Sequence, residues 1–118
     1  TTPRQTKVPP YIYADVIKGM RLAVTKGTAT VLYGTTYPVC GKTGTAENSG
    51  KDHSVFIGFA PMNEPKIAIS VYIEHGGFGA DVAAPIAGLI MEKYLKGKLS
   101  PKSQAMAKRI ERINTITK

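Results

Sequence analysis

The chain has 118 residues, of which 42% are hydrophobic and 20% are charged. This length allows at most one small domain with a compact core. The only cysteine, Cys40, excludes an internal disulfide, and no stretch approaches the roughly 18 apolar residues that a membrane-spanning helix needs. The chain begins with Thr1, and residues 1–10 are polar and proline-rich, so we expect a piece of a longer protein.

Lysine and arginine outnumber aspartate and glutamate by 16 to 8, and the formal net charge is +8. A small basic module that binds nucleic acid is therefore one alternative, and steeply salt-dependent affinity would support it. The positive charges are scattered, however, except where they crowd residues 98–118. We interpret residues 98–118 as a solvated basic tail, residues 1–97 as the domain, and expect no nucleic-acid partner.

The first predicted element is a helix over residues 11–26. Ile12, Val16 and Met20 are spaced four residues apart, which indicates one apolar stripe, and Gly27 ends the helix. Residues 28–38 are rich in threonine, glycine and tyrosine, and we expect a loop that leads into a glycine-rich strand over residues 37–47.

Two further strands and a second helix follow. Residues 53–60 come after a turn cluster and are apolar and aromatic, and residues 67–74 alternate apolar and other residues with period two. Asp81 can cap a helix that carries an apolar side and stops at Gly97. Beyond Pro101 we expect at most a weak amphipathic helix without a partner surface.

The order helix, strand, strand, strand, helix predicts the fold class. Short connections between strands favour antiparallel pairing, so we expect an α+β fold, an antiparallel three-stranded meander with flanking N-terminal and C-terminal helices.

One segment of the first strand carries the chemistry, namely Lys42-Thr43-Gly44-Thr45. A lysine attracts a carboxylate, threonine hydroxyls donate hydrogen bonds, and a glycine lets another backbone approach closely. Alternation places Lys42 and Gly44 on one face and Thr43 and Thr45 on the other, so one ligand reaches both sets only along the edge of the strand. The motif therefore predicts an edge strand that holds a peptide, although a lone tetrad of this kind also occurs in surface turns.

Two other kinds of site do not fit. A nucleotide-binding P-loop needs a glycine where Thr36 stands and a helix after the motif, whereas a turn and two strands follow here. His53, Glu74 and His75 lack the spacing of metal ligands. We expect neither a metal nor a cofactor.

Lys42-Thr43-Gly44-Thr45 resembles the third signature motif of penicillin-binding proteins and serine β-lactamases. Gly-Thr-Ala at 27–29, Phe-Ile-Gly-Phe-Ala-Pro at 56–61 and the glycines at 76–77 extend the resemblance over about residues 15–97 to the penicillin-binding protein 2 family. That family consists of class B peptidoglycan D,D-transpeptidases, whose transpeptidase domain has the fold of serine β-lactamases.

The resemblance implies cross-linking of peptidoglycan stem peptides and acylation by β-lactam antibiotics. It also implies a membrane-anchored parent with this domain on the outer, periplasmic face of a bacterial cytoplasmic membrane. A glycosyltransferase and elongation-complex proteins are the protein partners it suggests. A β-lactamase or a D,D-carboxypeptidase of the same superfamily remains an alternative.

Carried over residue by residue, the resemblance assigns roles to the motif. Lys42 would set the electrostatics of the active site, Thr43 and Thr45 would bind the terminal carboxylate, and Gly44 would leave room for it. The backbone N–H of Thr45 would be one of two oxyanion-hole donors. Lys42 and Thr45 are thus the catalytic candidates, and all four residues are substrate-binding candidates.

The sequence departs from the family pattern in one respect. None of its serines is followed by Lys at the third position or by Asn at the second, so the Ser-x-x-Lys and Ser-x-Asn motifs are absent. We expect both upstream of Thr1 and predict that the isolated chain is inactive. We also expect that residues 67–74, lacking a neighbouring strand, offer an open edge for self-association.

Overall fold

A computed structural model describes residues 7–47, 49–50, 52–77 and 81–116. Its elements are α1 (Pro10–Thr25), a 3-10 turn η1 (Thr30–Leu32), β1 (Cys40–Ala46), β2 (His53–Ala60), β3 (Ile67–Ile73), α2 (Ala83–Lys96) and α3 (Pro101–Ile116). The strands form one antiparallel sheet in the order β1-β2-β3. The predicted α+β meander with flanking helices is confirmed.

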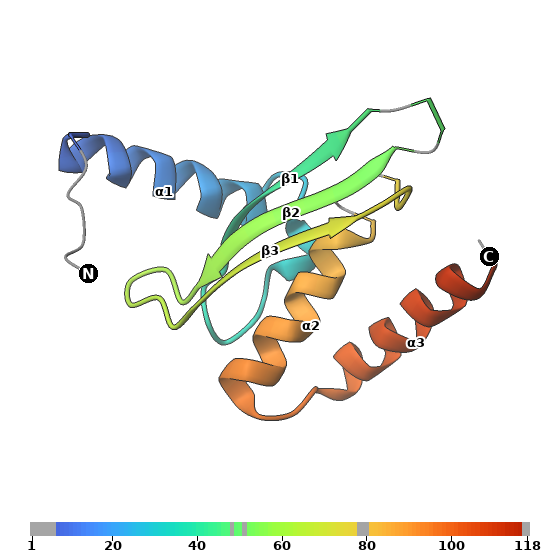
Figure 1. The fold of residues 1–118 in the computed structure, drawn as a ribbon. Coiled ribbons are helices and arrows are strands. Elements are labelled where there is room, and N and C mark those ends of the chain that lie inside the picture. Colours follow the sequence, from blue (N-terminus) through green and yellow to red (C-terminus); the bar gives the residue numbers. More distant parts are fainter. Residues whose placement is uncertain (1–6, 48, 51, 78–80, 117–118) are drawn as a thin grey trace, which may run out of the picture.

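The helices surround the sheet unequally (Figure 1). α1 packs against β1, while α2 lies across β2 and β3, and α3 contacts α2 and projects away from the sheet. The face of the sheet that meets α2 contributes Phe56 and Val71 to the core. Ala83, Ala84 and Ala87 of α2 are fully buried, and their small side chains let the helix approach the strands closely.

Phe56 fills the centre of this interface and is fully buried. Its ring lies over two glycines of neighbouring strands: a Cβ atom on Gly41 would lie 2.2 Å from the Phe56 Cζ, and one on Gly58 would lie 2.7 Å from the Phe56 Cε2. The two glycines face each other in the β1–β2 register. Gly41, one of the glycines of the first strand, therefore provides the space that the Phe56 ring occupies.

The N-terminus of α2 differs from the prediction. Val82, rather than Asp81, is the N-cap residue, and no side-chain bond caps the helix from that position. Instead the hydroxyl of the fully buried Ser54 in β2 accepts a hydrogen bond of 3.0 Å from the Ala83 N–H. The predicted Asp81 cap is wrong because a strand side chain already occupies this place. At the other end, Gly97 has φ +79° and ends the helix as predicted.

Residues beyond Gly97 are more regular than the sequence suggested. Ser100 accepts a 3.2 Å hydrogen bond from the Ser103 N–H, and Pro101 follows at the first helical position, which is a favourable start for a helix. The Glu92 carboxylate accepts a 3.2 Å bond from the Ser100 N–H and so joins α3 to α2. The region that we interpreted as a solvated basic tail is thus largely helical, and the expectation that this helix has no partner surface is wrong, because α3 contacts α2.

Candidate active-site strand

β1 is an edge strand among the residues that the structure describes, since only β2 pairs with it. In the register, Lys42 lies opposite Ile57, Thr43 opposite Phe56, Gly44 opposite Val55 and Thr45 opposite Ser54. Facing residues of an antiparallel pair share a face of the sheet. Thr43 therefore lies on the face that α2 covers and Lys42 on the other face, as the alternation predicts.

The four motif residues differ in exposure. Lys42 and Thr45 are exposed and Gly44 is half-buried, while Thr43 is only 9% exposed. The Lys42 Nζ donates a 2.8 Å hydrogen bond to the carbonyl of Thr43, so its ammonium lies along its own strand. A cation, an exposed hydroxyl and a sheltered hydroxyl therefore lie within four consecutive positions of an unpaired strand edge.

Thr43 has a partner that sequence reasoning did not identify. Its Oγ1 lies 2.5 Å from the Oγ1 of Thr28, which follows the C-terminus of α1. In the sequence, Thr28 contributed only to the resemblance, through the Gly-Thr-Ala triplet at 27–29. The only sequence signal that points to Thr28 is that this triplet directly follows a predicted helix.

Arg21 fixes α1 against the start of β1. Its Nη1 donates a 2.8 Å hydrogen bond to the Val39 carbonyl, and its guanidinium lies 5.8 Å from the centre of the Tyr33 ring. Burial raises the pKa of the neighbouring Cys40 thiol, and the Arg21 charge offsets part of that rise. Cys40 is therefore a buried thiol that stays protonated at neutral pH.

The far end of the sheet is joined to the loop that precedes α2. His53 lies opposite Ala46 of β1, and its Nδ1 accepts a 2.8 Å hydrogen bond from the His75 N–H. The Gly77 N–H donates to the Asp52 carbonyl at 2.7 Å. In the described part of the chain, no three His, Cys, Asp or Glu side chains are grouped so that they could hold a metal ion.

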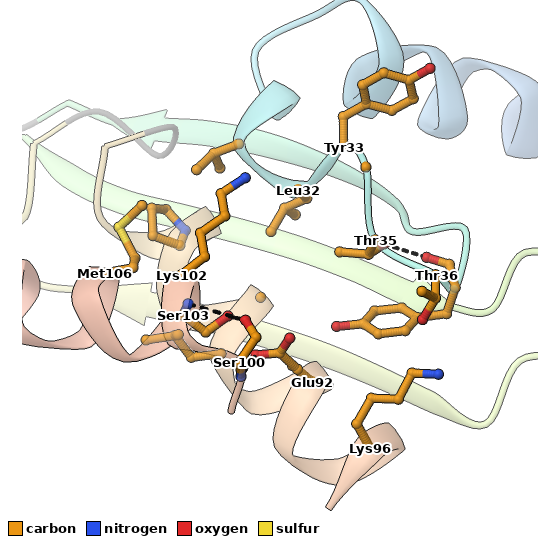
Figure 2. A pocket seen from close by; sticks show the side chains of 16 residues that line it. Leu32, Tyr33, Thr35, Thr36, Glu92, Lys96, Ser100, Lys102, Ser103 and Met106 are labelled. Atoms are coloured by element: carbon orange, nitrogen blue, oxygen red, sulfur yellow. Dashed lines mark hydrogen bonds between the residues drawn. The ribbon is translucent and has the colours of Figure 1, made fainter. Parts of the chain in front are cut away.

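A pocket of about 280 Å³ lies elsewhere, between the loop around η1, α2 and the start of α3 (Figure 2). Glu92, Ser100 and Ser103 stand together on its α2–α3 side. Burial alone would raise the pKa of Glu92, but hydrogen bonds from Ser103 and Ser100 outweigh it and lower that pKa. Burial, together with the Glu92 charge, raises the pKa of Tyr37 to about 12. None of the four motif residues lines this pocket, so the open edge of β1 is the candidate site.

None of the helices in the described ranges is long and apolar enough to cross a lipid bilayer.

An edge strand with Lys-Thr-Gly-Thr, in a three-stranded meander with helices packed on it, defines part of a penicillin-binding type of transpeptidase fold. Residues 1–92 match the sequence model of the penicillin binding protein transpeptidase domain. The chain belongs to this family.

Curated relatives agree with this assignment. The peptidoglycan D,D-transpeptidase MrdA of Haemophilus influenzae is 34% identical over an alignment of 79 residues, and the match covers 53% of this chain and 12% of that protein. MrdA of Acinetobacter baumannii is 41% identical over 69 residues, covering 42% of this chain and 10% of that protein. The chain thus matches only about a tenth of the length of these relatives.

Solved structures show the same fold. Pseudomonas aeruginosa PBP2, in a complex with WCK 5153, is 37% identical with a TM-score of 0.73 over 85% of this chain and 23% of that chain. Penicillin-binding protein A of M. tuberculosis, as its imipenem acyl-enzyme, is 32% identical with a TM-score of 0.68 over 78% of this chain and 21% of that chain.

Proposed function

We propose that this chain is the C-terminal part of the transpeptidase domain of a serine D,D-transpeptidase that cross-links peptidoglycan stem peptides. The observation that carries the proposal is the placement of Lys42, Thr43 and Thr45 on the unpaired edge of β1. An extended peptide can add to such an edge as a further strand, with its terminal carboxylate near the motif. A β-lactam with a carboxylate would occupy the same place.

Each motif residue has a role in the proposed site. Lys42 supplies the positive charge that attracts the carboxylate, and the hydroxyls of Thr43 and Thr45 donate hydrogen bonds to it. Gly44 leaves space, since a Cβ added there would meet no atom closer than the Val55 Cβ at 3.7 Å. The Thr45 N–H is the proposed oxyanion-hole donor, and loss of one such donor costs roughly 10² to 10³ in rate.

The nucleophile is proposed to lie outside this chain. The sequence has no Ser-x-x-Lys and no Ser-x-Asn, so acylation requires a longer parent protein that supplies both. The related β-lactamases and D,D-carboxypeptidases share the carboxylate-binding strand and differ in what attacks the acyl-enzyme. The reaction products therefore distinguish these classes. A transpeptidase parent transfers the acyl group of a stem peptide to an amine, whereas a D,D-carboxypeptidase transfers it to water.

The remaining proposals concern the parent and its surroundings. We place the domain on the periplasmic face of a bacterial cytoplasmic membrane, with an anchor outside residues 1–118. Stem peptides and β-lactams are the proposed ligands, and a glycosyltransferase and elongation-complex proteins are the proposed partners. Because β3 pairs with β2 alone in the described part of the chain, its second edge supports self-association of the isolated chain. Light scattering at high concentration tests this, since a monodisperse monomer contradicts it.

Labelling of the parent with a fluorescent penicillin tests the proposed function. The wild-type parent should become labelled, and Thr45→Val should slow labelling by about tenfold or more because a hydrogen bond to a charged group is lost. Thr45→Ser keeps the hydroxyl and should stay close to wild type. Labelling of the isolated chain, or an unchanged labelling rate in Thr45→Val, would contradict the proposal.

A further inference from the structure

We infer that Thr28 is a positioning residue for the carboxylate-binding strand: its hydroxyl holds the hydroxyl of Thr43 in the orientation that donates to a ligand carboxylate. This inference rests on the function proposed above. Thr28 itself does not touch the ligand, and it acts only through the 2.5 Å contact between the two Oγ1 atoms.

The backbone around Thr28 is held on both sides. A Cβ on Gly27 would lie 2.9 Å from the Ala23 Cα, so the chain can fold back this tightly on α1 only with glycine there. The next residue, Ala29, is fully buried and donates a 2.9 Å hydrogen bond from its N–H to the Ala23 carbonyl. Thr28 is therefore presented to β1 from a fixed position rather than from a free loop.

The hydroxyl pair has two possible arrangements. Each hydroxyl has one hydrogen to donate and two lone pairs to accept with, and only one hydrogen can lie between the two oxygens. When Thr43 donates to Thr28, Thr43 has no hydrogen left for a ligand. When Thr28 donates to Thr43, the hydrogen of Thr43 is directed elsewhere and is available to a carboxylate.

A bound carboxylate selects the second arrangement. The hydrogen bond from Thr43 to a carboxylate is charge-assisted, and a hydroxyl that already accepts a hydrogen bond is a better donor. Thr43 is 9% exposed, so few water molecules can take over the role of Thr28. Removing the Thr28 hydroxyl leaves Thr43 free to rotate and without the donor that strengthens it, so recognition of the carboxylate weakens.

An alternative role for the Thr28–Thr43 contact is purely structural, namely to join the end of α1 to β1. The following test distinguishes this structural role from orientation of the Thr43 hydroxyl. The second-order acylation rate of the parent is measured with benzylpenicillin and with its methyl ester, which lacks the anionic carboxylate. Thr28→Val removes the hydroxyl at nearly constant shape, and Thr28→Ser retains it. Thr30→Val is the matched control, because Thr30 is also an exposed threonine of this segment and lies outside the motif.

Thr28→Val should lower the acylation rate with benzylpenicillin by about tenfold and with the ester by less than about twofold. Thr28→Ser and Thr30→Val should stay within about twofold of wild type with both compounds. An equal loss with both compounds overturns the inference, since a role in strand support alone affects them alike. An unchanged ratio of the two rates overturns it as well.

A double-mutant cycle gives a second measurement. In a Thr43→Ala background, Thr28→Ala should not change the ratio of the two rates further, because the residue through which Thr28 acts is gone. A further change in that ratio overturns the inference, and this holds even if Thr28→Val does not fold. A wild-type parent that benzylpenicillin does not acylate contradicts the proposed function itself, whereas an acylated parent with an unaffected ratio in the variants contradicts only the role of Thr28.

Discussion

Gly41→Ala is expected to destabilise the fold through packing alone. The added Cβ would lie 2.2 Å from the Phe56 Cζ, 2.6 Å from its Cε1 and 2.8 Å from the Ile57 carbonyl oxygen. Carbon atoms in contact prefer separations of about 3.5–4.0 Å, so the overlap exceeds about 1 Å. Phe56 is fully buried and its ring also lies against Gly58, so the ring has no free space into which it could turn away from the new methyl group.

The expected cost lies at the upper end of the usual range for overpacking, about 3 kcal/mol. For a domain of this size such a loss lowers the melting temperature by on the order of 10 °C. Gly44→Ala is the matched control, because its Cβ would make an ordinary contact of 3.7 Å with Val55. Both substitutions reduce the entropy of the unfolded chain equally, by about 0.4–1 kcal/mol, so this contribution cancels between them.

Thermal and urea unfolding of the two variants and of the wild-type chain measure this difference. Gly41→Ala should unfold at a clearly lower temperature and urea concentration than Gly44→Ala, which should stay within about 1 kcal/mol of wild type. Equal stabilities for the two variants would refute the reasoning that the Phe56 ring requires glycine at position 41.

Three further predictions concern polar side chains close to α2. Ser54→Ala leaves the buried Ala83 N–H without its hydrogen bond and should cost about 1–3 kcal/mol in urea unfolding; a smaller loss than for an exposed Ser49→Ala contradicts the capping role. Because the folded-state pKa of Glu92 is lowered, its stabilising contribution is present above the unfolded-state pKa and is lost as the pH falls through the folded value. Glu92→Gln should therefore be less stable near neutral pH and show a weaker loss of stability on acidification, and an unchanged pH profile would argue against this. In an ultraviolet titration, Tyr37 should ionise near pH 12, and the late step should disappear in Tyr37→Phe; if the late step persists, it belongs to another tyrosine.

Most of the sheet was predictable from local sequence. β2 spans His53–Ala60, the same residues that the apolar run and its flanking turn cluster predicted, and β3 ends within one residue of the prediction. The first strand begins later than predicted, at Cys40, because Pro38 has no N–H for a strand ladder and the Thr35 hydroxyl donates to the Tyr37 carbonyl.

Features that depend on distant residues were not predictable in the same way. The capping hydroxyl of Ser54 lies 29 residues before Ala83 in the sequence. The residues next to the start of the helix therefore predicted Asp81 as its cap instead. The four motif residues could be proposed as a candidate site from the sequence alone, and within the described part of the chain they alternate along an edge strand as predicted. Thr28 could not, because 15 residues separate it from Thr43 and only the fold brings them together.

The most direct test of the proposed transpeptidase function is to locate the serine that penicillin acylates. The parent and the isolated 118-residue chain are each treated with benzylpenicillin, digested and analysed by mass spectrometry. We expect a single acylated serine in the parent, outside residues 1–118, and no adduct on the isolated chain. An adduct on any serine within residues 1–118, or a parent that forms no adduct, would contradict it.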